Sequence, residues 1–208
     1  MFVRVAARWF LACLSISIFS AAMHAQYAPP TTYTLVENFD VGQKSVVKSY
    51  RNGSKAAVDA KTETMHIRQI LDFDKHQSVS WDETNATAPC ERTEISADWG
   101  DPFSQSSSFE DDLKKSNAKQ EPSETLLGIK AEVWSTSNPD GEAKIWIDKA
   151  HSLLLKYQVT AKSSPARTLI EVTQVSFAPP PEAMFVEPAR CTSVALPMHV
   201  PIAGVGLR

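Results

Sequence analysis

The chain has 208 residues, enough for one domain with a substantial hydrophobic core. Its 21 basic and 24 acidic residues give a net charge of −3, and 43% of its residues are hydrophobic. No excess of basic charge is available to hold a polyanion, which disfavours a nucleic-acid partner and simple adsorption to an anionic membrane.

The first 25 residues have the layout of a secretory signal peptide. Arg4 and Arg8 precede an apolar stretch at 9–19, and small residues then lead to an A-x-A-like site at Ala25. A transmembrane anchor is disfavoured because the stretch is shorter than the roughly 20 residues that span a bilayer. A lipoprotein signal at Cys13 is the weaker alternative, because the apolar stretch continues past that cysteine. We expect an exported protein, periplasmic or secreted, with no transmembrane segment in the mature chain. Loss of the two arginines takes its net charge from −3 to −5.

The mature chain is expected to form a single domain at 41–191. Before it, residues 26–40 hold a flexible lead and the first strand; Pro29 and Pro30 bar regular structure in the lead, which extends to residue 34. After it, residues 192–208 carry apolar clusters without a helical or strand period, which predicts a poorly ordered tail.

Two hairpins are predicted in the first half of the domain. Strands at 43–51 and 55–60 flank Asn52-Gly53, the strongest short hairpin signal. Strands at 63–73 and 77–82 flank a turn at 74–76. In the first strand of that second hairpin, alternation places four apolar residues on one face, and a solvent-like set, His66, Arg68 and Asp72, on the other. The four are Met65, Ile67, Leu71 and Phe73.

Residues 83–127 interrupt this strand pattern. Loop residues dominate the segment, and Trp99 and Phe103 stand on a turn between them. Ser108 with Asp111 three residues later predicts the capped start of one short helix. This irregular part is the one expected to cover the sheet.

Four strands in series follow, at 128–134, 142–148, 151–160 and 167–177. The loops between them are too short for parallel crossovers, so the strands form an antiparallel meander. The fold class is mainly β (α+β): a curved up-and-down sheet, or incomplete barrel, with short covering helices. Apolar residues alternate with charged ones, which predicts one covered face. The candidate ligand-binding residues on that face are Val133, Ile145, Ile147, Leu153, Leu155 and Tyr157.

Two tryptophans are predicted on the opposite, exposed face of the meander. Trp134 and Trp146 lie on strands joined at 138–141, as a cross-strand pair that stiffens the sheet by roughly 0.2 to 1 kcal/mol. The alternative is a stacking platform for a glycan or a partner.

Cys90 and Cys191 are the two cysteines left after the leader. An even pair in an exported chain predicts a disulfide. It would close a loop of about 100 residues, for which loop entropy gives roughly 4 to 5 kcal/mol as an upper figure. Two free thiols are the alternative.

No catalytic or cofactor motif accompanies these strands. The mature histidines have no partners at metal-ligand spacing, so we interpret them as solvated strand or turn residues. The aspartates of the first half lack calcium-loop spacing and suit turns, although a carboxylate dyad or calcium site is the alternative. We therefore expect no enzyme, no cofactor and no metal. The histidines are His66, His76, His151 and His199, and the aspartates are Asp72, Asp74, Asp82, Asp98 and Asp101.

The chain resembles the LolA/LolB-like periplasmic lipoprotein-carrier fold over most of residues 40–188. The resemblance is carried by Gly128 opening a strand, the strand end at 146–148, Leu155-Lys156-Tyr157 after a turn, the long strand to Phe177, and 181–188. It implies an incomplete barrel that holds acyl chains or other hydrophobic ligands on a concave side capped by short helices.

Two functions from different classes follow from these features. The first is an exported, non-enzymatic binding module that holds a lipid, an acyl chain or another hydrophobic ligand on the concave face of its sheet. The alternative is a cell-envelope protein that binds another protein through its sheet edge or aromatic surface, or that has a structural role without a bound ligand.

Overall fold

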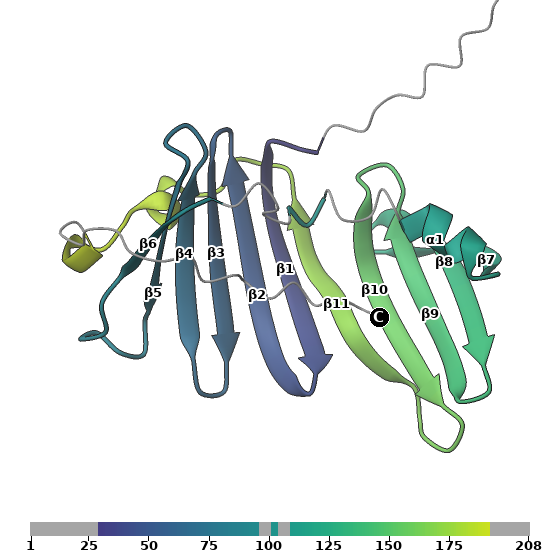
Figure 1. Ribbon diagram of the computed structural model, residues 1–208. Coiled ribbons are helices and arrows are strands. Elements are labelled where there is room, and N and C mark those ends of the chain that lie inside the picture. The colour runs from purple at the N-terminus through teal and green to yellow at the C-terminus, as the bar shows by residue number, and fades with distance from the viewer. Residues whose placement is uncertain (1–28, 96–100, 104–108, 192–208) are drawn as a thin grey trace, which may run out of the picture.

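The computed structural model describes residues 29–95, 101–103 and 109–191, with the side chains of 109–111 excepted. Within these ranges eleven strands form one open, curved, antiparallel sheet in the order β6-β5-β4-β3-β2-β1-β11-β10-β9-β8-β7 (Figure 1). The strands are β1 Thr32–Val41, β2 Gln43–Asn52, β3 Lys55–Thr62, β4 His66–Asp72, β5 Gln77–Asp82, β6 Glu91–Glu94, β7 Lys119–Leu126, β8 Ile129–Asn138, β9 Gly141–Asp148, β10 Leu153–Ala161 and β11 Arg167–Ser176. The predicted fold class is confirmed.

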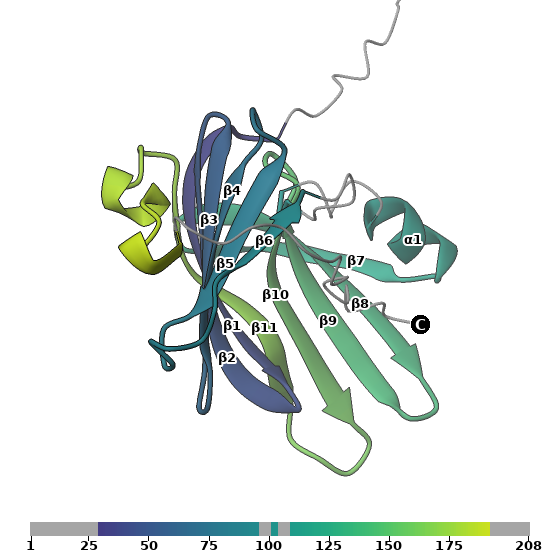
Figure 2. The ribbon, with the colours of Figure 1, turned by 60° about the vertical axis from the view of Figure 1, so that its left-hand side comes forward.

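The sheet consists of two meanders joined along β1 and β11. Strands β1 to β6 run outward in chain order to one edge, and β7 to β11 run inward from the other edge (Figure 2). The junction pairs Leu35 with Val175, residues that are far apart in the sequence. Each meander is held by local hairpins, whereas this junction is the long-range contact that makes them one sheet.

The predicted hairpins are present. Asn52 pairs with Lys55, and Gly53 between them has φ of +59°, the left-handed conformation that the Asn-Gly turn requires. The prediction was wrong at three places. Residues 32–34, expected in the flexible lead, belong to β1, and β6 and β7 lie within the segment expected to be irregular.

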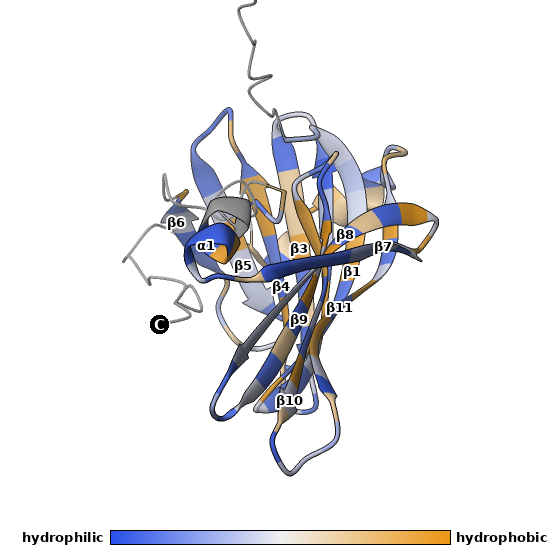
Figure 3. Ribbon diagram, turned by 90° about the vertical axis from the view of Figure 1, so that its right-hand side faces the viewer, coloured by the Kyte–Doolittle hydropathy of each residue, from blue (hydrophilic) through white to orange (hydrophobic). Residues whose placement is uncertain are grey.

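Strand β7 was not predicted from the sequence because it is an edge strand. It has a bulge between Glu121 and Glu124 where Pro122 stands, and most of its residues are hydrophilic (Figure 3). Pro and charged side chains are typical of edge strands because they discourage pairing with other chains. Such a strand has no apolar alternation from which it could be recognised.

The helices and short turns cover both faces of the sheet. Helix α1, Phe109–Lys115, confirms the predicted short helix, while Ser108, its predicted cap, lies outside the described residues. Leu113 of α1 packs against Trp134, Ile145 and Ile147. At the other end of the sheet, the 3₁₀ turns η2, Glu182–Phe185, and η3, Ala189–Cys191, lie against β3 to β6.

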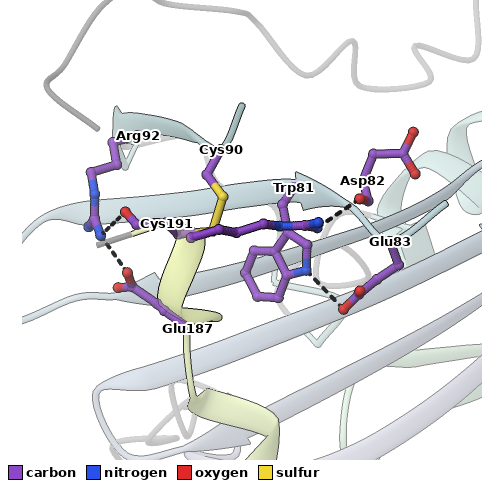
Figure 4. The surroundings of a disulfide bond; sticks show 8 residues. Trp81, Asp82, Glu83, Cys90, Arg92, Glu187 and Cys191 are labelled. Atoms are coloured by element: carbon purple, nitrogen blue, oxygen red, sulfur yellow. Dashed lines mark hydrogen bonds and ion pairs between the residues drawn. A yellow bond between two sulfur atoms is a disulfide. The ribbon is translucent and has the colours of Figure 1, made fainter. Parts of the chain in front are cut away.

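The Cys90–Cys191 disulfide anchors this C-terminal segment, as predicted (Figure 4). The two Cα atoms are 5.2 Å apart. Arg92 is ion-paired with Glu187 and donates to the carbonyl oxygen of Cys191 at 2.9 Å, and Arg190 donates to a carbonyl oxygen of β5 at 2.9 Å. Covalent and polar contacts together hold the segment over the apolar side chains of β3 to β5.

Candidate binding surface

The six candidate ligand-binding residues do not share one face. Val133, Leu153 and Leu155 are buried with Phe103, while Ile145, Ile147 and Tyr157 pack with Leu113 on the opposite side of the sheet. The reason is the register between β8 and β9, in which Val133 pairs with Trp146 rather than with an isoleucine. The expected single apolar face is therefore wrong; whether these residues touch a ligand stays a prediction.

The same register separates the two tryptophans. Trp134 pairs with Ile145, so Trp134 and Trp146 lie on opposite faces, and both are buried. The expected exposed cross-strand pair is wrong. Trp146 donates from Nε1 to Glu124 at 2.8 Å, whereas Nε1 of Trp134 has no hydrogen-bond partner in the described part of the chain.

A short turn at 101–103 fills the centre of the buried cluster that contains Val133, Leu153 and Leu155. Phe103 has an exposed fraction of 0%, and its ring centroid lies 4.6 Å from that of Tyr33. Asp101 accepts from the backbone N–H of Phe103 at 2.9 Å and from Arg51 at 2.9 Å. Burial and the nearby Asp101 carboxylate raise the pKa of Tyr33 far above its usual value, so Tyr33 stays neutral. We call the side of the sheet that carries Tyr33 and Phe103 the Phe103 face.

Part of the Phe103 face stays open on β1 to β4. Pairing across these strands aligns Glu37, Val47, Ala60 and Ile67 in one row on the same side as Tyr33 and Leu35. The row runs from partly buried at Glu37 to 36% exposed at Ile67, and Met65 beside it is 48% exposed. We call these five residues, Glu37, Val47, Ala60, Met65 and Ile67, the open row.

Sequence alternation had placed Met65 and Ile67 on a covered face with Leu71 and Phe73. Leu71 is buried, but Met65 and Ile67 are exposed, and the opposite side of β4 is also covered, since Ile70 packs under the C-terminal segment. The alternation of apolar residues along 65–73 thus included Met65 and Ile67 of the open row. Nothing in the sequence distinguished a covered apolar face from an exposed one.

Glu37 is the polar member of the open row. Its cross-strand neighbours are Val47 and Val172, and it has no hydrogen-bond or ion-pair partner among the described residues. Burial raises the pKa of its carboxyl group from 4.5 to about 7. Sequence reasoning missed this residue, because a glutamate in an alternating strand normally marks the solvent side.

Glu37→Gln is expected to stabilise the protein at pH 8. The pKa of this carboxyl group is higher in the folded state than its value of 4.5 in the unfolded state. The protonated group therefore stabilises the fold fully below pH 4.5, and this stabilisation is lost as the pH rises through 7. The pKa shift corresponds to up to about 3 kcal/mol of stability. The increase in unfolding free energy caused by Glu37→Gln should therefore be about 2 to 3 kcal/mol larger at pH 8 than at pH 5. Urea unfolding at both pH values measures it. Equal effects at the two pH values would show that Glu37 titrates normally.

A depression of about 480 Å³ lies where β1, β2, β3 and β11 end. Asn38, Val46 and Lys61 in its lining pair across β1 to β3, on the side of the sheet opposite to the open row. Most of its lining residues are polar or charged, but apolar atoms make up most of the surface that they expose there. Asp40 on its rim accepts from Arg167 at 2.7 Å, and this hydrogen bond holds the pKa of Asp40 below its usual value. Phe39, Ser45 and Thr62, also in the lining, pair across the same strands on the side of the open row, so the depression lies at the strand ends and draws residues from both sides of the sheet.

The remaining candidates for chemistry are dispersed. His66 is hydrogen-bonded to Asp59 at 2.7 Å and His151 to Asp148 at 2.6 Å, pairs that the sequence had not indicated. The first-half aspartates serve separate turns and ion pairs, and Asp98 and His199 lie outside the described residues. Over the ranges that the structure describes, no three His, Cys, Asp or Glu side chains gather as metal ligands. No helix within those ranges has the length and hydropathy to cross a membrane.

Comparison of the sequence with protein-family models and with curated proteins gives no match. Among solved structures, the chain is similar to an uncharacterized conserved protein from Thermus thermophilus, with 11% identity and a TM-score of 0.46 over 77% of this chain and 87% of that one. It is similar to the Pseudomonas aeruginosa MucA/MucB complex structure, with 13% identity and a TM-score of 0.48 over 79% of this chain. That match spans 58% of the other chain. At TM-scores below 0.5 these likenesses identify no ligand and no partner, and the lipoprotein-carrier resemblance stays a prediction about fold.

Proposed function

We propose that the chain is an exported, non-enzymatic binding module that holds a hydrophobic ligand on the open row. The observation that carries this proposal is the exposure of Met65 and Ile67, at 48% and 36%, on a face whose neighbouring part is completely buried. An antiparallel sheet normally presents polar residues on an uncovered face. Contiguous apolar side chains left uncovered are typical of binding sites.

The position of the site differs from the sequence-based expectation. The β8 to β10 part of the sheet has its apolar side chains covered by Phe103 and Leu113 of the chain itself. Val133 and Leu155 are buried in the same cluster as Phe103, so a ligand could reach them only after a rearrangement of that cluster. The open row is accessible without such a rearrangement, which is why we place the ligand there.

A protein partner is the alternative function. Its simplest mode would be the addition of a strand to a sheet edge. Both edges disfavour it: β6 has four residues, three of them charged, and β7 has a bulge at Pro122 and several charged side chains. A protein partner would then have to use the open row as well.

Ile67→Lys is expected to weaken the binding of a neutral apolar fluorophore, N-phenyl-1-naphthylamine, at least about ten-fold, because a bound apolar ring would remove water from the new ammonium group and from Asp82, which pairs with residue 67 across the strands. Fluorescence titration of the purified full-length protein measures the dissociation constant.

The matched control is Val46→Lys, which introduces the same charge at a residue that is 37% exposed on the opposite side of the sheet. It should leave the affinity within about two-fold. Val46 also lines the depression from that opposite side, so the control tests whether the fluorophore binds there. Absence of fluorophore binding by the unmodified protein, or equal weakening by the two variants, would refute the proposed function.

A further inference from the structure

Among the five residues of the open row, Glu37 at one end is the only carboxylate, while Asp82 of β5 pairs with Ile67 at the other end. Glu37 sits between Leu35 and Phe39 on its own strand and between Val47 and Val172 on the neighbouring strands. Each of these four neighbours is apolar, and the described residues supply Glu37 with no cation and no hydrogen-bond donor. A carboxyl group buried in this way loses hydration without compensation.

We propose that the hydrophobic ligand is a single-chain amphiphile whose head group is a protonated amine, bound by the Glu37 carboxylate. This inference rests on the proposed function and adds the chemical class of the ligand. An ammonium group beside Glu37 would supply the missing charge-assisted hydrogen bonds. Its alkyl chain would lie over Val47, Ala60 and Ile67.

The length of the row fits such a chain. Glu37 to Ile67 crosses three interstrand spacings, roughly 14 Å in total. An extended alkyl chain advances about 1.25 Å per carbon, so ten or eleven carbons match the row. An acidic head group would be repelled by Glu37, and a neutral head group would gain no ion pair.

Among the described residues, the other titratable groups near Glu37 and along the open row are neutral or have partners of their own. At the far end of the row, Asp82 accepts from the Thr84 hydroxyl at 2.6 Å. On the same face of its own strand the nearest is Tyr33, which stays neutral, while Asp40 lies on the other face and accepts from Arg167 at 2.7 Å. On β2, Arg51 is paired with Asp101 of the covering turn at 2.9 Å. On β11, Glu171 is next to Val172 and is paired with Lys156 of β10 at 3.5 Å. Proton binding at Glu37 should therefore control the binding of a cation at this place.

The test compares decylammonium, decanol and decanoate as displacers of N-phenyl-1-naphthylamine from the full-length protein. At pH 8 we expect decylammonium to bind at least about ten-fold more tightly than decanol, and decanoate to bind weakest. Between pH 8 and pH 5 the preference for decylammonium should disappear as Glu37 takes up a proton, since the amine stays charged throughout.

Glu37→Gln should abolish the preference for the amine while it retains the affinity for decanol. Glu171→Gln is the matched control, because it removes the same charge from the adjacent strand and should preserve the preference. If the three head groups bound equally, or if Glu37→Gln kept the preference, this inference would be wrong while the proposed function stood.

If no probe or displacer bound, the proposed function itself would fail. Two further outcomes overturn the assignment of the ligand. One is self-association in light scattering that Ile67→Lys abolishes, which would put a second copy of the chain on the row. The other is displacement by an apolar peptide with one lysine but not by decylammonium, which would put a protein there.

Discussion

Phe103→Ala is expected to lower the free energy of unfolding by about 3 to 5 kcal/mol, as measured by urea denaturation. Phe103 is completely buried at the centre of a cluster drawn from β1, β8, β9, β10 and β11. Truncation would leave a cavity where the two meanders meet, and the well-packed strands on either side cannot collapse to fill it. The large cost follows from the cavity as much as from the lost apolar contact.

Phe177→Ala is the matched control. It removes the same ring from a residue whose centroid lies 6.0 Å from that of Phe103, but Phe177 is 39% exposed. This variant should lose about 1 kcal/mol of unfolding free energy, because a large part of the Phe177 ring is already exposed to water in the folded protein. A small effect of Phe103→Ala, comparable with that of the control, would show that the turn at 101–103 is not part of the stable core.

Replacement of Cys90 and Cys191 by alanine is expected to cost about 4 kcal/mol of unfolding free energy. The bond closes a loop with a sequence separation of 101 residues, and its loss frees that loop in the unfolded state. It also releases the C-terminal segment that covers Ile70, Val79 and Trp81. The measurement is urea unfolding of the oxidised protein and of the double variant.

A reducing agent provides the control for this prediction. Dithiothreitol should destabilise the unmodified protein by the same amount and leave the double variant unchanged. A difference below about 1 kcal/mol between oxidised and reduced protein would mean that Arg92 and Arg190 hold the segment without help from the disulfide.

The positions of most strands could be predicted from the sequence because their signals are local. Asn52-Gly53 specifies its hairpin through the backbone conformation that glycine permits, and alternation along 129–133 and 143–147 reflects the period of a strand. The disulfide could be predicted because the expected removal of residues 1–25 would leave only one pair of cysteines. Strand β7 could not, since an edge strand needs no apolar face.

The register of β8 and β9 could have been derived from the turn that joins them. A two-residue loop pairs Asn138 with Gly141, so every even-numbered residue of β8 faces an odd-numbered residue of β9. Trp134 and Trp146 are both even-numbered and therefore cannot lie opposite each other. The exposed aromatic pair was excluded by turn geometry before any tertiary contact was considered.

The sequence by itself thus determined most of the strands, the two hairpins of the first half, the four-strand meander of the second half, and the disulfide, because each depends on neighbours in the chain or on composition. Only the tertiary structure decided how the meanders join along β1 and β11, that Phe103 fills one apolar region, and that Met65 and Ile67 are left open. The physical reason is that alternation gives the side of a strand on which a residue lies and says nothing of what covers that side. That no described residue pairs with Glu37 has the same origin, since a carboxylate is free or paired according to what distant strands bring beside it.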